Sequence, residues 1–179
     1  MQTYHAKDLA RSFRTVRKNT ITIAQEIPED KYSFRATPDT RTVAETLAHL
    51  AVSPNWQKRM HSEGITAPDF SKFGEEMQRM VAAEKALDTK AKIVAALQRD
   101  GDDFAAWTET LSDATLAEHV HFPAPVEPPS KSRLEMLLSV KEHEMHHRAQ
   151  LMVIERMIGI VPHLTREFQA RVAAAAGKP

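Results

Sequence analysis

Apolar residues recur along this chain at intervals of three and four, the spacing that gathers side chains on one face of an α-helix. The first apolar stripe spans residues 9–27 and stops at Pro28, which cannot continue a helix. The next segment, from Glu29 to Arg41, is polar, contains Pro38 and predicts a loop. No run of residues alternates cleanly enough to predict a strand, so the pattern indicates an all-α protein.

A capping box predicts the start of the second helix. Thr42 stands at the N-cap and Glu45 follows three residues later, so each side chain covers a free backbone N–H of the other residue. Apolar residues continue past Pro54 until Gly64, where the helix is expected to end.

The third helical region runs from about residue 75 to residue 111 and divides near Leu87 and Asp88 into two pieces. After it, residues 121–129 contain four prolines, which predict a stiff, extended crossover between helices. Helical patterns lie on both sides of this stretch, so we interpret it as a connection inside the fold.

The fourth helix opens with a second capping box, from Ser132 to Glu135, and ends at Gly159. A short amphipathic segment, residues 165–175, follows it. These elements predict a four-helix bundle with long crossover connections and a short C-terminal helix. The length of the chain is typical of a single domain, which we place over residues 1–179.

Composition restricts the chemistry available to this fold. The 179 residues include 24 basic and 24 acidic side chains, nine histidines and no cysteine. The balanced charge gives no reason to bind nucleic acid or an anionic membrane, and no apolar run is long enough to cross a bilayer. The first residues do not resemble a signal peptide, so we expect a cytoplasmic protein that acts on a small molecule. Without cysteine the chain has no disulfide, thiolate ligand or cysteine nucleophile.

Two histidines in the middle of the fourth helix have the spacing of metal ligands. His143 and His147 are four residues apart, so they share one face of the helix, and that face is the inward one. Two neutral imidazoles placed in this way can chelate one divalent ion. His146 is rotated from His147 by about 100° and is not expected to join them.

The second helix supplies a third imidazole, His49, in the middle of an apolar stretch. If the second and fourth helices are neighbours, His49 faces the pair, and three nitrogen ligands leave coordination positions open, as in catalytic zinc sites. The alternative is a core histidine bonded to a carbonyl or carboxylate. The pair His143 and His147 favours the metal, because burying two imidazoles without a partner is costly.

Other polar and aromatic residues are weaker candidates, since each is equally compatible with a solvated helix face or with ordinary packing. Possible partners for the outer ring nitrogens of the ligands are Glu45, Glu142, Glu144 and Gln150. Residues that could line the mouth of a pocket are Tyr32, Arg35 and Trp56. Histidines near predicted helix ends or loops, which we expect in solvent, are His5, His61, His119, His121 and His163.

Two stretches of this sequence resemble the DinB superfamily. The first is Thr-Val-Ala-Glu-Thr-Leu-Ala-His-Leu at 42–50, and the second is His-Glu-Met-His-His-Arg-Ala-Gln-Leu at 143–151. In that family a histidine ends a short amphipathic stretch of helix two, and the last bundle helix carries His-x-x-x-His followed by Arg-Gly-Gln. The family histidines correspond here to His49, His143 and His147. The glycine after the arginine is replaced by Ala149, which is still small.

The resemblance implies a four-helix bundle, a three-histidine site for zinc, nickel or a similar divalent ion, and a homodimer. Characterised members include S-transferases and isomerases that use low-molecular-weight thiols. Because this chain has no cysteine, any thiol must come from outside. We therefore expect a metal-dependent transferase or isomerase that uses a small thiol or metal-bound water, with a non-catalytic, metal-bound dimeric module as the alternative.

The same letters also match the zinc-protease signature His-Glu-x-x-His. In that interpretation Glu144 is the general base and Glu167 a possible third ligand, which makes the protein a zinc hydrolase. The absence of a predicted strand beside the motif argues against it, since such proteases hold their substrate along a sheet edge. Substitution of His49 separates the two hypotheses, because only the three-histidine site needs that residue.

Overall fold

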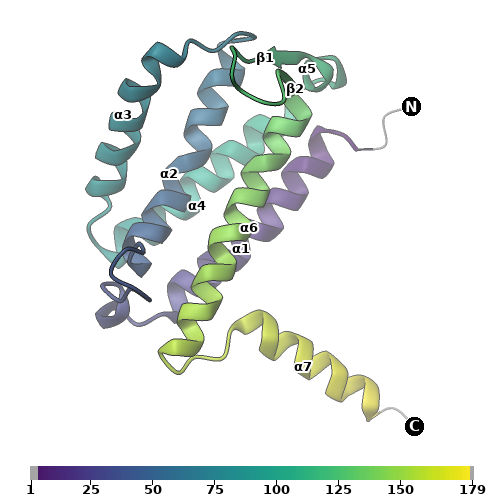
Figure 1. The fold of residues 1–179 in the computed structure, drawn as a ribbon. Coiled ribbons are helices and arrows are strands. Elements are labelled where there is room, and N and C mark those ends of the chain that lie inside the picture. Colours follow the sequence, from purple (N-terminus) through teal and green to yellow (C-terminus); the bar gives the residue numbers. More distant parts are fainter. Residues whose placement is uncertain (1–3, 178–179) are drawn as a thin grey trace.

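The computed structural model describes residues 4–177. Four long helices form the bundle: α1 (Ala6–Glu26), α2 (Val43–Ser62), α4 (Lys90–Glu109) and α6 (Arg133–Met157) (Figure 1). α1 packs against α4 and α6, and α2 packs against the same two helices, so α1 and α2 occupy opposite corners of the bundle.

This order around the bundle explains the long connections. The chain crosses the bundle twice, between α1 and α2 over residues 27–42 and between α4 and α6 over residues 110–132. The predicted four-helix bundle with long crossover connections is therefore confirmed. The consequence for function is that α2 and α6, which carry the three histidines, are direct neighbours.

The helix starts follow the local signals in the sequence. Thr42 Oγ1 accepts the Glu45 N–H at 3.1 Å, and Glu45 Oε2 accepts the Thr42 N–H at 2.7 Å, which completes the predicted capping box. At α6 only half of the second box forms. Ser132 Oγ accepts the Glu135 N–H, whereas the Glu135 carboxylate lies beside Lys131.

The third helical region divides where predicted, into α3 (Phe73–Ala86) and α4. α3 lies outside the bundle along α2 and contains no buried residue (Figure 1). Short 3-10 turns cover Glu29–Lys31 (η1) and Phe70–Lys72 (η2), and short helix α5 covers Asp113–Ala117. The C-terminal helix α7 (His163–Ala176) extends away from the bundle.

The sequence predicts no strand, but the structure contains a small hairpin, which corrects that prediction. β1 (His119–His121) pairs antiparallel with β2 (Ser130–Ser132), and the proline-rich stretch joins them. Strands of three residues are too short to show an alternating pattern. Val120 is buried beside Met60 and Met136, so the hairpin covers one end of the bundle.

Two histidines expected in solvent are buried, which corrects that prediction. His61 lies under the hairpin end of the bundle, where Arg133 Nη1 donates to its Nδ1 at 2.8 Å. Burial, followed by the Arg133 charge, lowers the pKa of His61 to about 4. His163, at the start of α7, contacts Asn19 of α1. Both are covered by segments distant in the sequence.

A buried ion pair occupies the centre of the bundle. Arg17 of α1 is 3% exposed and Glu144 of α6 is 1% exposed. Arg17 Nε lies 2.9 and 3.0 Å from the two carboxylate oxygens, and Nη2 lies 2.9 Å from Oε2. Arg17 also donates to the carbonyls of Leu50 in α2 and Leu97 in α4, so one side chain links all four bundle helices.

A proline and a glycine inside two of the helices accommodate this arginine: Pro54 leaves a carbonyl free to bond it, and Gly101 leaves space for its side chain. Pro54 has no N–H, so the carbonyl of Leu50, four residues earlier, is free to accept from Arg17. Gly101 is buried against the arginine, and a Cβ there would stand 2.8 Å from Arg17 Cγ. The proline and the glycine inside two helices are thus explained by one contact.

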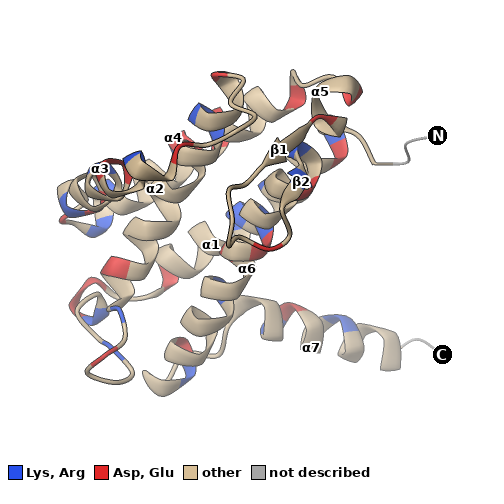
Figure 2. Cartoon of the chain, turned by 45° about the horizontal axis from the view of Figure 1, so that its top comes forward, with Lys and Arg blue, Asp and Glu red and all other residues tan. Residues whose placement is uncertain are grey.

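The surface carries acidic and basic residues interspersed along the helices (Figure 2). Among residues 4–177, no helix is long and apolar enough to cross a membrane.

Candidate metal centre

Three imidazoles converge between α2 and α6. His49 comes from α2, and His143 and His147 come from successive turns of α6. Their ring centroids are 4.7–5.2 Å apart, and one nitrogen from each ring lies within 4.8 Å of the others. The structure therefore brings together the three histidines named from the sequence, and His146 stays outside the group.

The spacing of the nitrogens suits a shared cation. Nε2 of His49 lies 3.0 Å from Nε2 of His143. Two nitrogens bound to one tetrahedral metal at about 2.0–2.1 Å are separated by about 3.3 Å, so only a small adjustment is required. The three histidines can thus hold one divalent ion.

Hydrogen bonds at the outer nitrogens orient two of the rings. His49 Nδ1 lies 2.7 Å from Glu84 Oε1, and His147 Nδ1 lies 2.8 Å from Gln150 Oε1. Both oxygens are acceptors, so each Nδ1 donates its hydrogen, and in the neutral ring Nε2 then keeps a lone pair. This arrangement, with a carboxylate or carbonyl behind the imidazole, is typical of metal-ligating histidines.

Glu84 is the polar partner that sequence reasoning missed. It reaches His49 from α3, a helix whose position beside α2 is not encoded in the local pattern. Of the candidates named from the sequence, only Gln150 bonds a ligand in the described residues. Glu45 caps α2, and Glu144 points into the bundle centre.

Burial favours the neutral form that binds metals. Burial, followed by the nearby His147 and His49, lowers the pKa of His143 to about 4. Burial is also the largest cause that lowers the pKa of His147. Imidazoles with depressed pKa values do not hold a proton at neutral pH, so protons compete weakly with a cation.

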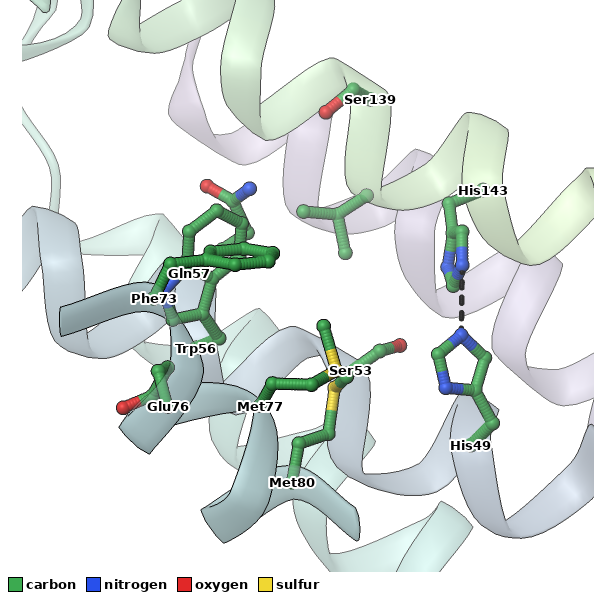
Figure 3. Close-up of a pocket in the computed structure, with 11 residues that line it drawn as sticks. His49, Ser53, Trp56, Gln57, Phe73, Glu76, Met77, Met80, Ser139 and His143 are labelled. Carbon is green, nitrogen blue, oxygen red and sulfur yellow. Dashed lines mark hydrogen bonds between the residues drawn. The ribbon is translucent and has the colours of Figure 1, made fainter. Parts of the chain in front are cut away.

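Cavities reach the histidines from two sides. A cavity of about 330 Å³ lies between α2, α3 and α6, with His49 and His143 at one end (Figure 3). A second cavity, of about 350 Å³, contacts His147 and Arg41. Arg41 is also the smallest contributor among the charges that lower the pKa values of His143 and His147. Small molecules can therefore reach the histidines from either side.

Only one of the three residues proposed for the pocket mouth is found there. Trp56 lines the first cavity. Tyr32 is instead buried in the core, where its hydroxyl donates to the Ala24 carbonyl at 2.6 Å. Arg35 lies 3.6 Å from Glu45 at the start of α2.

The zinc-protease interpretation does not fit this geometry. Glu144 would have to face the metal as a general base, but its carboxylate is turned toward α1 and engaged by Arg17. Glu167 lies on α7 and is absent from the group of candidate ligands among the described residues.

Comparison with known proteins agrees with the fold. Residues 12–151 match the profile of the DinB superfamily. A DinB-like protein of Bacillus subtilis, YjoA, is 20% identical, with a TM-score of 0.62 over 84% of this chain and 91% of that chain. YfiT of Bacillus subtilis, described as a probable metal-dependent hydrolase with an unusual four-helix bundle topology, is 17% identical, with a TM-score of 0.66 over 89% and 91%. No curated protein matches this chain.

Proposed function

Since this chain belongs to the DinB superfamily, we propose that it is a metal-dependent enzyme whose divalent ion is held by His49, His143 and His147. One observation carries the proposal: three imidazole nitrogens meet at the end of an open cavity. Two of the rings are fixed from behind by Glu84 and Gln150. A purely structural cluster needs no such opening.

The donor set favours zinc or nickel, because imidazole nitrogen suits both ions. When bound, such an ion supplies a Lewis acid and lowers the pKa of a water or thiol ligand. Glu84 contributes by accepting the Nδ1 hydrogen of His49, which keeps Nε2 of that ring directed at the cluster. The described chain offers no fourth side chain to the group, so positions are left for reactants.

We assign the reaction to transfer or isomerisation with a low-molecular-weight thiol. The chain contains no cysteine, so the sulfur nucleophile is an external molecule. The cavity beside His147 supports this assignment, because Arg41 lines it and favours an anionic ligand such as a thiolate. Hydrolysis with water is the second candidate, and its support is the description of YfiT as a probable metal-dependent hydrolase.

We further propose a homodimer formed through α7. The exposed apolar side chains Phe168 and Val172 lie on this helix, which extends from the bundle (Figure 1). A second copy of the chain would remove this surface from water. Light scattering of the wild type and of a Phe168→Ser variant tests the assembly, and equal monomeric masses would reject it.

The first experiment is elemental analysis of protein purified without added metal. We expect about one zinc or nickel per chain in the wild type and in His121→Ala, and loss of the metal in His49→Ala. His121 is the control, because it is an exposed histidine of β1 outside the cluster. Metal retained by His49→Ala would refute the three-histidine site.

The second experiment separates the reaction classes. Metal-loaded protein is incubated with monochlorobimane and a panel of small thiols, and separately with esters and no thiol. Thiol-dependent conjugation above the metal-free protein supports the transferase assignment, whereas ester cleavage alone supports a hydrolase. No turnover in either assay supports the non-catalytic, metal-bound module.

A further inference from the structure

The cavity on the His49 side has a chemical character that the metal centre does not require. Its wall on the α3 side is built from Phe73, Met77 and Met80. Phe73 is 47% exposed and Met77 is 38% exposed, although both are large and apolar. Large apolar side chains that gather in the open around a cavity are a sign of a ligand surface.

The lining of this cavity extends along α2 away from the imidazoles. On α2, the lining residues His49, Ser53 and Trp56 are spaced by four and three, so they form one line along the helix. Seven residues at 1.5 Å each give a length of about 10 Å between His49 and Trp56. Figure 3 shows the imidazoles at one end of the cavity and the rings of Trp56 and Phe73 toward the other.

Three polar side chains of this lining are already engaged by other parts of the protein. Glu76 forms an ion pair with Arg59, and Ser139 Oγ donates to the Met136 carbonyl. The side-chain oxygen of Gln57 lies 3.2 Å from His61 Nε2. Away from the histidines and Ser53, the walls therefore offer a bound molecule mainly apolar contact.

We infer that this cavity binds the apolar part of the substrate, an uncharged aryl or alkyl group up to about 10 Å long, and holds its reacting end at the histidines. Methionines at 77 and 80 adapt their shape, so the cavity accepts a range of such groups. The placement of the substrate's reacting end at the histidines rests on the proposed function, whereas binding of its apolar group does not need the metal.

Fluorescence titration with the uncharged dye N-phenyl-1-naphthylamine tests the inference on the full chain, with and without zinc. The test variant is Met77→Gln/Met80→Gln, because glutamine keeps side-chain length and helix propensity while adding polarity. Met157→Gln is the matched control, since Met157 is 53% exposed at the end of α6 and outside the cavity. Circular dichroism and metal content establish that each variant keeps the fold and the site.

We expect saturable dye binding by the wild type and Met157→Gln, and a Kd raised about tenfold in Met77→Gln/Met80→Gln. On the metal-free protein, 2-naphthol should displace the dye at lower concentration than the charged 2-naphthoate. The inference is overturned by absent binding, by equal Kd values in the wild type and the double variant, or by stronger competition from 2-naphthoate. If His49→Ala retained its metal, the proposed function would be rejected, but the dye-binding result would still stand.

Discussion

Replacement of Arg17 by methionine tests how strongly its buried ion pair with Glu144 stabilises the bundle. Methionine has a similar length but no charge, so it fills the space and leaves the Glu144 carboxylate buried without a partner. Removal of one member of a buried ion pair costs about 3–5 kcal/mol. The carbonyl of Leu50 also loses its donor, and Pro54 cannot replace it, which adds about 1 kcal/mol or more. We expect a total loss of about 4–6 kcal/mol, a large part of the stability of an ordinary domain.

Urea unfolding of a double-mutant cycle measures this effect and separates it from simple loss of packing. Glu144→Leu is the second single variant, and Arg17→Met/Glu144→Leu removes both charges. Because an apolar pair of similar volume can replace a buried ion pair at little cost, the double variant should recover most of the lost stability. Equal costs of Arg17→Met in the wild-type and Glu144→Leu backgrounds would refute the coupling that the structure shows.

Three further outcomes follow from particular contacts. Glu84→Gln should weaken zinc binding by about 10- to 100-fold in a chelator competition, while Glu75→Gln, exposed on the same helix, leaves it unchanged. Glu155 is buried, and burial raises its pKa to about 7, so the folded state holds a proton that the unfolded state releases above about pH 4.5. The free energy of unfolding therefore falls as the pH rises toward 7. At pH 8, Glu155→Gln should be more stable to urea than the wild type, by up to about 3 kcal/mol in the free energy of unfolding. At pH 4.5 the two proteins should have the same stability. Gly101→Ala should cost about 1–3 kcal/mol in the same assay, because its Cβ meets Arg17; an unchanged midpoint would contradict the close approach.

The bundle could be predicted from the sequence because its signals are local. Apolar residues spaced by three and four, the capping box at Thr42 and the stop at Pro28 each act within a few residues of the helix they define. The hairpin at residues 119–132 was missed for the opposite reason. Its strands are three residues long, and they form because Val120 finds a buried place between α2 and α6.

The candidate site also has a part that local sequence signals predict and a part that depends on how the helices pack. His143 and His147 share a helix face by spacing alone, and His49 required only the assumption that α2 and α6 are neighbours. Glu84 could not be found, because its role depends on α3 lying beside α2, and α3 carries many similar charges. The apolar cavity could not be predicted either, because its lining comes from three helices and only Trp56 among the lining residues was a candidate for a pocket from the sequence.

The letters His-Glu-x-x-His show how a neighbouring helix decides the meaning of a motif. Glu144 follows His143 directly, so its side chain turns about 100° around α6 from the histidine face. Because α6 packs against both α2 and α1, one face meets His49 and the other meets Arg17, 127 positions earlier in the chain. A glutamate neutralised by a buried arginine cannot serve as a free general base. The identity of the residue opposite the glutamate, rather than the motif itself, therefore separates a bundle metal site from a protease site.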